Sequence, residues 1–169
     1  LSDLQKITTL QINVDWLAVV KQLPNKHLKI ENDLVLVLDE IKDPGNFWTI
    51  IRIADWYWIT KIVASNTTVE FYNPKVIIST MWSFTRVWVY YTDLNEYLTW
   101  NKENVYWAFL NWENIHQAKL SKTGYIVIWN ESKGISKEIE KFVTNKITIP
   151  RVWNAESLNA WIATWIILD

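Results

Sequence analysis

Apolar and polar positions alternate along the chain in a pattern that predicts strands and helices in turn. Short runs rich in Val and Ile, such as DLVLVLDEI at residues 33–41, are typical of buried strands. The pattern predicts strands at residues 33–41, 61–65, 87–91, 105–110, 124–129 and 146–150. It predicts helices at residues 11–22, 47–58, 73–84, 93–100, 136–143 and 154–169.

Capping residues support several of the predicted helices. Asn73 stands before a proline, which is typical of an N-cap and the first helical position. Thr92 or Asp93 is a candidate cap for the next helix, and Ser136 for a later one. The residues 43–46 are predicted to turn the chain before a helix starts. Because buried strands joined by helices run parallel, we predict an α/β fold with a mostly parallel sheet and flanking helices.

The totals of the sequence exclude several classes of protein. A length of 169 residues suits one domain, and a net charge of -1 shows no generally basic surface for nucleic acid. The absence of cysteine excludes disulfides, and the isolated His27 and His116 lack metal-ligand spacing, so no metal is expected. No apolar run reaches about 18 residues, so no membrane span is expected.

Polar residues gather after three of the predicted strands, at the place where open α/β sheets bind ligands. Residues 39–46 with Arg52 follow the first strand, residues 130–134 follow the fifth, and residues 154–159 follow the last. Their Gly, Asn and Ser residues expose donors and acceptors that suit an adenosine-type ligand. Neither a GxGxxG dinucleotide fingerprint nor a GxxxxGK[ST] phosphate loop is present.

The same residues also allow a purely structural interpretation. Arg52 fits a surface ion pair, and Glu131 fits a solvated acid that a helix dipole favours. Ser157 and Asn159 fit simple helix caps. The residues taken one by one leave these alternatives open.

In their order, these segments resemble the SpoU-type (TrmH-like) RNA 2'-O-ribose methyltransferases of the SPOUT superfamily. The first motif is DPGN at residues 43–46 with Arg52, and the second is WNESKGI at residues 129–135. The third motif is Ile-Pro followed after a short segment by ESLN, within residues 149–159. The segment NPKVIISTMWSFTRVWV at residues 73–89 also looks like the family.

The resemblance implies that S-adenosylmethionine is the cofactor and that the substrate is a ribose 2'-hydroxyl in structured RNA, either rRNA or tRNA. It assigns catalysis to Asn46, Arg52, Glu131, Ser157 and Asn159. It assigns cofactor binding to Thr80, Met81, Ile128, Trp129, Asn130, Gly134, Ile149, Pro150, Ser157 and Leu158. The guanidinium of Arg52 keeps its proton at neutral pH, so it cannot readily accept another proton as a base. We therefore expect Arg52 to position an RNA phosphate and the hydroxyl.

The resemblance covers about Leu34 to Leu168 and implies an α/β knot, with a deep C-terminal trefoil. It also implies a cytoplasmic homodimer, in which Arg52 comes from one subunit and the cofactor loops from the other. Residues 1–24 look like a linker and N-terminal helix that follow a missing RNA-binding domain. Residues 25–169 are expected to form the methyltransferase catalytic domain.

Two residue counts depart from the usual composition, with 3 glycines and 13 tryptophans in 169 residues, whereas glycine averages about 7%. The resembled family has glycine at the positions of Trp48, Trp58, Trp82, Trp107, Trp112, Trp129, Trp153 and Trp165. Trp88 and Trp161 also stand where smaller residues are expected. Since overpacking one site costs roughly 1–3 kcal/mol, our hypothesis is that tryptophan stands for glycine through substitution or miscoding.

Two other functional readings stay open. A catalytically impaired RNA-binding or dimerisation module on the same fold would accommodate tryptophan in the cofactor loops. The retained Asn46, Arg52, Glu131 and Asn159 favour the enzyme, because a retired site has no need of them. A SPOUT enzyme that modifies a base fits less well, because the Asn-to-Arg spacing matches the ribose type.

The miscoding hypothesis predicts the mass of the protein made in its own host. We expect intact-mass spectrometry to give a mass below the 20.1 kDa of this sequence. For each affected site, the mass should be lower by the difference between a tryptophan residue and a glycine residue. A mass of 20.1 kDa would show that the tryptophans are real.

Overall fold

A computed structural model describes residues 6, 19–130, 134–151 and 158–169. In this part of the chain six strands form one sheet in the order β3-β2-β1-β5-β4-β6, and every neighbouring pair is parallel. The strands are β1 Leu34–Asp39, β2 Lys61–Ser65, β3 Trp88–Thr92, β4 Val105–Asn114, β5 Gly124–Trp129 and β6 Asn145–Thr148. The predicted α/β fold with a mostly parallel sheet is therefore confirmed.

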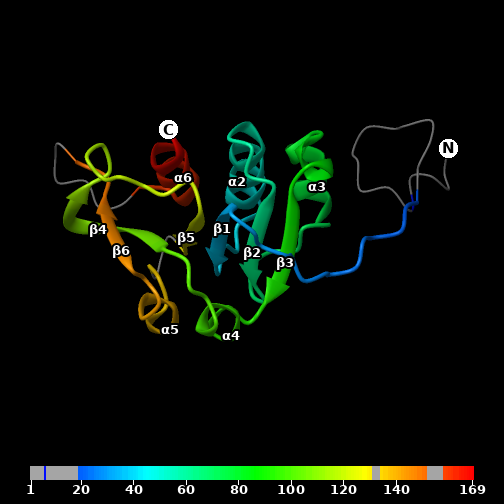
Figure 1. Ribbon diagram of the computed structural model, residues 1–169. Helices are drawn as coiled ribbons and strands as arrows, with labels where there is room; N and C mark the ends of the chain where they lie inside the picture. Colours follow the sequence, from blue (N-terminus) through cyan, green and yellow to red (C-terminus); the bar gives the residue numbers. More distant parts are fainter. Residues whose placement is uncertain (1–5, 7–18, 131–133, 152–157) are drawn as a thin grey trace.

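Helices cover both faces of the sheet (Figure 1). They are α2 Pro44–Trp56, α3 Pro74–Thr80, α4 Leu94–Thr99, α5 Lys137–Glu140 and α6 Ala160–Leu168, with a 3₁₀ turn η1 at Ser83–Thr85. Helices α2, α3 and α6 lie along one face, and α4 and α5 along the other (Figure 1). None of the helices in the described ranges is long and apolar enough to cross a membrane.

Strand β1 forms the middle of the core, because its side chains are buried on both faces of the sheet. Leu36 and Leu38 pack into the cluster that includes Phe47 of α2, and Val35 and Val37 pack into the cluster on the α4 side. All four side chains are fully buried. This double burial explains why the strand reads as a continuous apolar run in the sequence.

The strands lie close to their predicted positions, and the helix boundaries differ more. The residues 43–46 were predicted to form a turn before the helix, and this was wrong, because Asp43 is the N-cap and α2 begins at Pro44. Helix α3 ends at Thr80, earlier than predicted, because Met81 takes a left-handed conformation with φ 55°. Residues 19–22 are not helical, and the rest of the helix predicted at 11–22 lies outside the described ranges.

An ion pair ties the end of α2 to the turn before β3. Arg86 donates from Nε to Asp55 Oδ1 at 2.8 Å and from Nη2 to Asp55 Oδ2 at 2.6 Å. Ser83 donates its hydroxyl to Asp55 Oδ2 at 2.8 Å. The hydrogen bonds from Arg86 hold the pKa of Asp55 below its usual value, against the opposing effect of burial. This bidentate ion pair gives Arg86 a structural role, away from the strand ends where the ligand site is expected.

The structure shows a backbone cost at Trp58, one of the positions where glycine is expected. Helix α2 ends in a Schellman motif, in which Ile59 N donates to Ala54 O at 2.8 Å and Trp58 N to Asp55 O at 3.2 Å. Trp58 occupies the left-handed position of this motif with φ 59°, and its side chain is 88% exposed. Glycine is the usual residue here, because a Cβ costs about 1–2 kcal/mol in this conformation.

Trp107 is expected to lower the stability of the fold for a different reason. Its indole Nε1 is buried and has no hydrogen-bond partner among the described residues. Its ring centroid lies 3.6 Å from that of Phe109, closer than the roughly 4.5–7 Å of ordinary aromatic pairs. The rings of Trp82 and Trp112 are exposed instead, so the packing cost falls on only some of the candidate positions.

We expect Trp58→Gly to raise the free energy of unfolding by about 1 kcal/mol, because it relieves the left-handed backbone while removing an exposed ring. Urea denaturation measures this change. The matched control is Trp58→Ala, which removes the same ring but keeps Cβ, and it should not stabilise the protein. Equal stabilisation by both variants would contradict the backbone argument and would assign the cost to the ring.

Candidate functional site

The candidate site lies at the edge of the sheet where β1 and β5 end. These strands are parallel neighbours with Asp39 opposite Trp129, so the segments that follow them leave from the same place. The first runs through Glu40 into α2, and the second begins at Asn130. The predicted first and second motifs therefore start side by side.

The start of α2 is fixed by its cap. Asp43 Oδ1 accepts a hydrogen bond from Asn46 N at 2.8 Å. A Cβ on Gly45 would lie 2.7 Å from the same oxygen, so a side chain at this position would displace the capping carboxylate. Pro44 fits the first helical turn, where its missing N–H has no partner to lose. The Asp-Pro-Gly-Asn sequence is thus a helix start that places Asn46 at the sheet edge.

Asn46 meets Asn159, which lies 113 residues later in the chain. The Nδ2 group of Asn159 donates to Asn46 Oδ1 at 3.2 Å, and Asn159 Oδ1 caps α6 by accepting from Trp161 N at 3.0 Å. Both side chains are partly buried. The structure therefore brings together the amides of the predicted first and third motifs, through the packing of α6 on α2.

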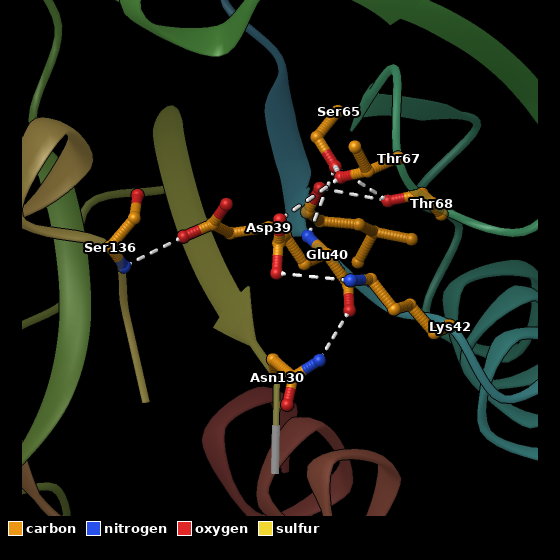
Figure 2. A network of polar contacts seen from close by, with 9 residues as sticks. Asp39, Glu40, Lys42, Ser65, Thr67, Thr68, Asn130 and Ser136 are labelled. Atoms are coloured by element: carbon orange, nitrogen blue, oxygen red, sulfur yellow. Dashed lines mark hydrogen bonds and ion pairs between the residues drawn. The ribbon is translucent and has the colours of Figure 1, made fainter. Parts of the chain in front are cut away.

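The second motif is held by the end of β1 (Figure 2). Asn130 Nδ2 donates to the carbonyl oxygen of Glu40 at 2.9 Å. Ser136 N donates to Asp39 Oδ2 at 2.9 Å, and the Asp39 side chain is buried. Two consecutive residues of one chain segment thus contact both sides of the second motif.

Asn130 and Gly134 are joined by a backbone bridge, in which Gly134 N donates to Asn130 O at 2.9 Å. Gly134 has φ 72°, and a Cβ there would meet nothing within 4 Å. The glycine therefore serves the backbone conformation and leaves open space beside it. Before this bridge, Ile128 is fully buried, and the half-buried Trp129 ring packs against Trp107 with centroids 5.8 Å apart.

Ile149 and Pro150 follow β6 and line a cavity of about 610 Å³. The second half of α6 and the residues 115–120 form its other walls. Leu158, two residues before α6, has an exposed side chain. Ile149 and Pro150 thus line a cavity beside the C-terminal half of α6, whereas Leu158 lies next to Asn159 at the start of that helix.

Arg52, Thr80 and Met81 are not part of this cluster in the single chain. Arg52 is exposed on α2, with its guanidinium carbon 5.6 Å from the centre of the Trp48 ring. It lies roughly 9 Å along the helix axis from Asn46. Thr80 is buried at the end of α3 and donates its hydroxyl to Ile77 O at 2.9 Å, and Met81 is exposed beyond it. Both residues lie at the C-terminal end of α3, and no described contact joins them to Asn130 or Asn159.

Two predicted catalytic residues, Glu131 and Ser157, lie outside the described ranges, as does Trp153. Sequence analysis counted Asp39 and Glu40 among the polar residues after the first strand and Ser136 as a helix cap, but it assigned none of them to catalysis or cofactor binding; the structure places all three at the site. The signal was present, because an acid pair that follows a buried apolar strand has an unusual position for charged residues.

The chemistry offered by the described residues is that of amides, backbone groups and apolar surface. The described ranges contain no group of three or more His, Cys, Asp and Glu side chains that could hold a metal ion. Neutral donors and acceptors beside apolar side chains suit a nucleoside-like ligand, as the sequence predicted.

The chain is similar in sequence to a known family and to several methyltransferases. A family model described as the SpoU rRNA methylase family matches residues 33–169. An uncharacterized tRNA/rRNA methyltransferase of Borreliella burgdorferi is 28% identical over 145 residues, which cover 83% of this chain and 64% of the relative. The Bacillus subtilis 23S rRNA (guanosine(2553)-2'-O)-methyltransferase RlmP is 27% identical over 156 residues, covering 90% and 62%. The chain thus spans less than two thirds of these relatives.

Solved structures agree with the sequence relatives. The structure of a protein described as a putative RNA methyltransferase of the TrmH family, from Porphyromonas gingivalis, has a TM-score of 0.84 at 28% identity, covering 98% of this chain and 69% of that one. An AdoMet-bound rRNA methyltransferase from Sinorhizobium meliloti has a TM-score of 0.74 at 26% identity, covering 80% and 54%. With the family model matched over most of its length, this chain belongs to the SpoU rRNA methylase family.

Proposed function

We propose that this chain is the catalytic domain of an S-adenosylmethionine-dependent methyltransferase that acts on a ribose 2'-hydroxyl of rRNA or tRNA. The observation that carries the proposal is the hydrogen bond between Asn46 and Asn159. It unites two segments from distant parts of the chain at the edge where Asn130 is also held. A structural helix cap would not need a second asparagine from another helix.

Two features of the described residues support the binding of a cofactor. Gly134 leaves open space beside a left-handed backbone turn, and Ile149 and Pro150 line a cavity with apolar walls. The residues that would hold the cofactor are Ile128, Trp129, Asn130, Gly134, Ile149, Pro150 and Leu158, together with Ser157. When bound, the cofactor supplies a methyl group activated by a sulfonium centre. The protein contributes orientation of the reacting atoms and exclusion of competing geometries.

Arg52 is the residue proposed to hold the RNA. Its planar guanidinium suits bidentate contact with a phosphate, and its exposure leaves it accessible to a large substrate. Asn46, Glu131 and Asn159 would orient the ribose hydroxyl by hydrogen bonds. Loss of the hydroxyl proton would be eased by the nearby guanidinium charge and not by Arg52 acting as a free base.

The separation of Arg52 from the cofactor residues supports a site shared between two subunits. Within one chain, α2 carries Arg52 away from the sheet edge and leaves its side chain exposed. A homodimer that brings Arg52 of one copy to the cofactor edge of the other would complete the site. We propose this assembly, together with the C-terminal trefoil knot, a preceding RNA-binding domain and a cytoplasmic location.

We expect Arg52→Ala to lower the rate of methyl transfer by about 100-fold or more, because a positioning and charge-stabilising group is lost. Affinity for S-adenosylmethionine should stay within about twofold of wild type. Labelled methyl transfer to unmodified rRNA and tRNA, with nucleoside analysis for 2'-O-methylation, measures the rate, and calorimetry measures cofactor affinity. Lys75→Ala, an exposed cation on α3, is the control and should keep full activity. A wild-type rate in Arg52→Ala would reject this role.

A shared site makes a separate prediction for mixed dimers. Arg52→Ala and Asn159→Ala should each be inactive, and their co-expression should restore about a quarter of wild-type activity. Half of the dimers are then mixed, and each mixed dimer holds one intact site. The same methyl-transfer assay measures recovery. No recovery from mixed dimers confirmed by mass spectrometry would place Arg52 and Asn159 of one site in the same chain.

A further inference from the structure

We propose that Asp39 and Glu40, at the end of β1, are positioning residues that hold the second motif in its cofactor-binding arrangement. This inference rests on the function proposed above, and it concerns residues that make no proposed contact with the cofactor themselves. It assigns the carboxylate of Asp39 to the Ser136 side of the motif and the carbonyl of Glu40 to the Asn130 side.

Asp39 makes a contact that its burial makes necessary. Its side chain is 5% exposed, and a carboxylate taken out of water needs hydrogen-bond donors. Ser136 N donates to Asp39 Oδ2 at 2.9 Å. Ser136 is the N-cap of α5, and its own side chain makes no capping hydrogen bond. The carboxylate of β1 therefore fixes the place at which the chain enters α5.

Glu40 holds the other side through its backbone. Its φ of 56° lies in the left-handed region, which is uncommon for a residue with a side chain. In this conformation its N–H donates to Ser65 Oγ at 3.0 Å, and its carbonyl accepts from Asn130 Nδ2 at 2.9 Å. Strained backbone of this kind persists where surrounding contacts determine it, and it is common at functional sites.

Side chains at and just after the end of β2, together with Lys42, hold Glu40 in this conformation (Figure 2). Ser65 Oγ also shares a hydrogen bond with Thr68 Oγ1 at 2.9 Å, and Thr68 Oγ1 donates to Leu38 O at 3.3 Å. The Glu40 carboxylate pairs with Lys42 Nζ at 3.4 Å. These contacts connect the second motif to two central strands, so a substitution at Asp39 should reach Gly134 although Asp39 itself makes no proposed cofactor contact.

The test uses paired variants on both partners of one hydrogen bond. Asp39→Ala removes the acceptor, whereas Asp39→Asn keeps an oxygen that can accept from Ser136 N. Ser136→Pro removes the donor at a residue whose φ of -67° suits proline, whereas Ser136→Ala keeps it. We expect Asp39→Ala and Ser136→Pro to weaken S-adenosylmethionine binding about tenfold, and the other two to stay within about twofold.

Two readouts separate positioning from general loosening. Calorimetry gives the dissociation constant, and hydrogen exchange should be faster in peptides that contain Gly134 and Ser136 in the two weakened variants. Asp33→Ala is the matched control, because Asp33 also accepts from a backbone amide, that of Glu31 at 2.9 Å, at the opposite edge of the sheet. It should lower thermal stability without changing cofactor affinity.

Unchanged affinity and exchange in Asp39→Ala and Ser136→Pro would overturn the inference. An equal loss of affinity in Asp33→Ala would also overturn it, because the effect would then come from lower overall stability. If wild-type protein gives no heat with S-adenosylmethionine, the proposed function fails. Exchange near Gly134 would still decide whether Asp39 holds the segment.

Discussion

The carboxyl end of β1 is the constraint on which the site depends. Its side chains are buried on both faces, so the strand cannot shift without exposing apolar surface to water. Its parallel neighbour β5 ends opposite it, at Trp129. Helix α2 starts at Pro44, five residues after Asp39, and is capped by Asp43. The two motifs therefore take their relative position from the core, and the contacts of Asp39 and Glu40 with the second motif reinforce it.

The sequence predicted the strands well because burial leaves a direct mark on composition. Residues 61–65 and 124–129 were predicted with the boundaries that the structure shows. Helix boundaries depend on caps and on single backbone angles, which letters reveal less clearly. Asp43 could be read as a turn residue or as a cap, and the left-handed φ of Met81 ends α3 without any glycine to signal it.

The candidate site was predictable in parts. The meeting of Asn46 and Asn159 followed from motif resemblance, and no local pattern links positions 113 residues apart. The place of Thr80 and Met81, with no described contact to Asn130 or Asn159, depends on the direction of α3 and could not be read from residue types. Asp39 carried a signal, as an acid after a buried strand, but its partner is a backbone N–H, which has no signature in the sequence.

The tryptophans show how local conformation can distinguish residues that composition treats alike. At Trp58 the backbone conformation favours glycine, because the Schellman motif places that residue in the left-handed region. At Trp107 the side chain is the difficulty, because its buried N–H has no partner in the described structure. At Trp48 neither cost is visible, and the ring lies against Arg52. A glycine at Trp48 would leave the proposed RNA-binding arginine without this stacking surface and would change its rotamer freedom. The identity of that one residue therefore bears on function, whereas Trp58 and Trp107 bear on stability.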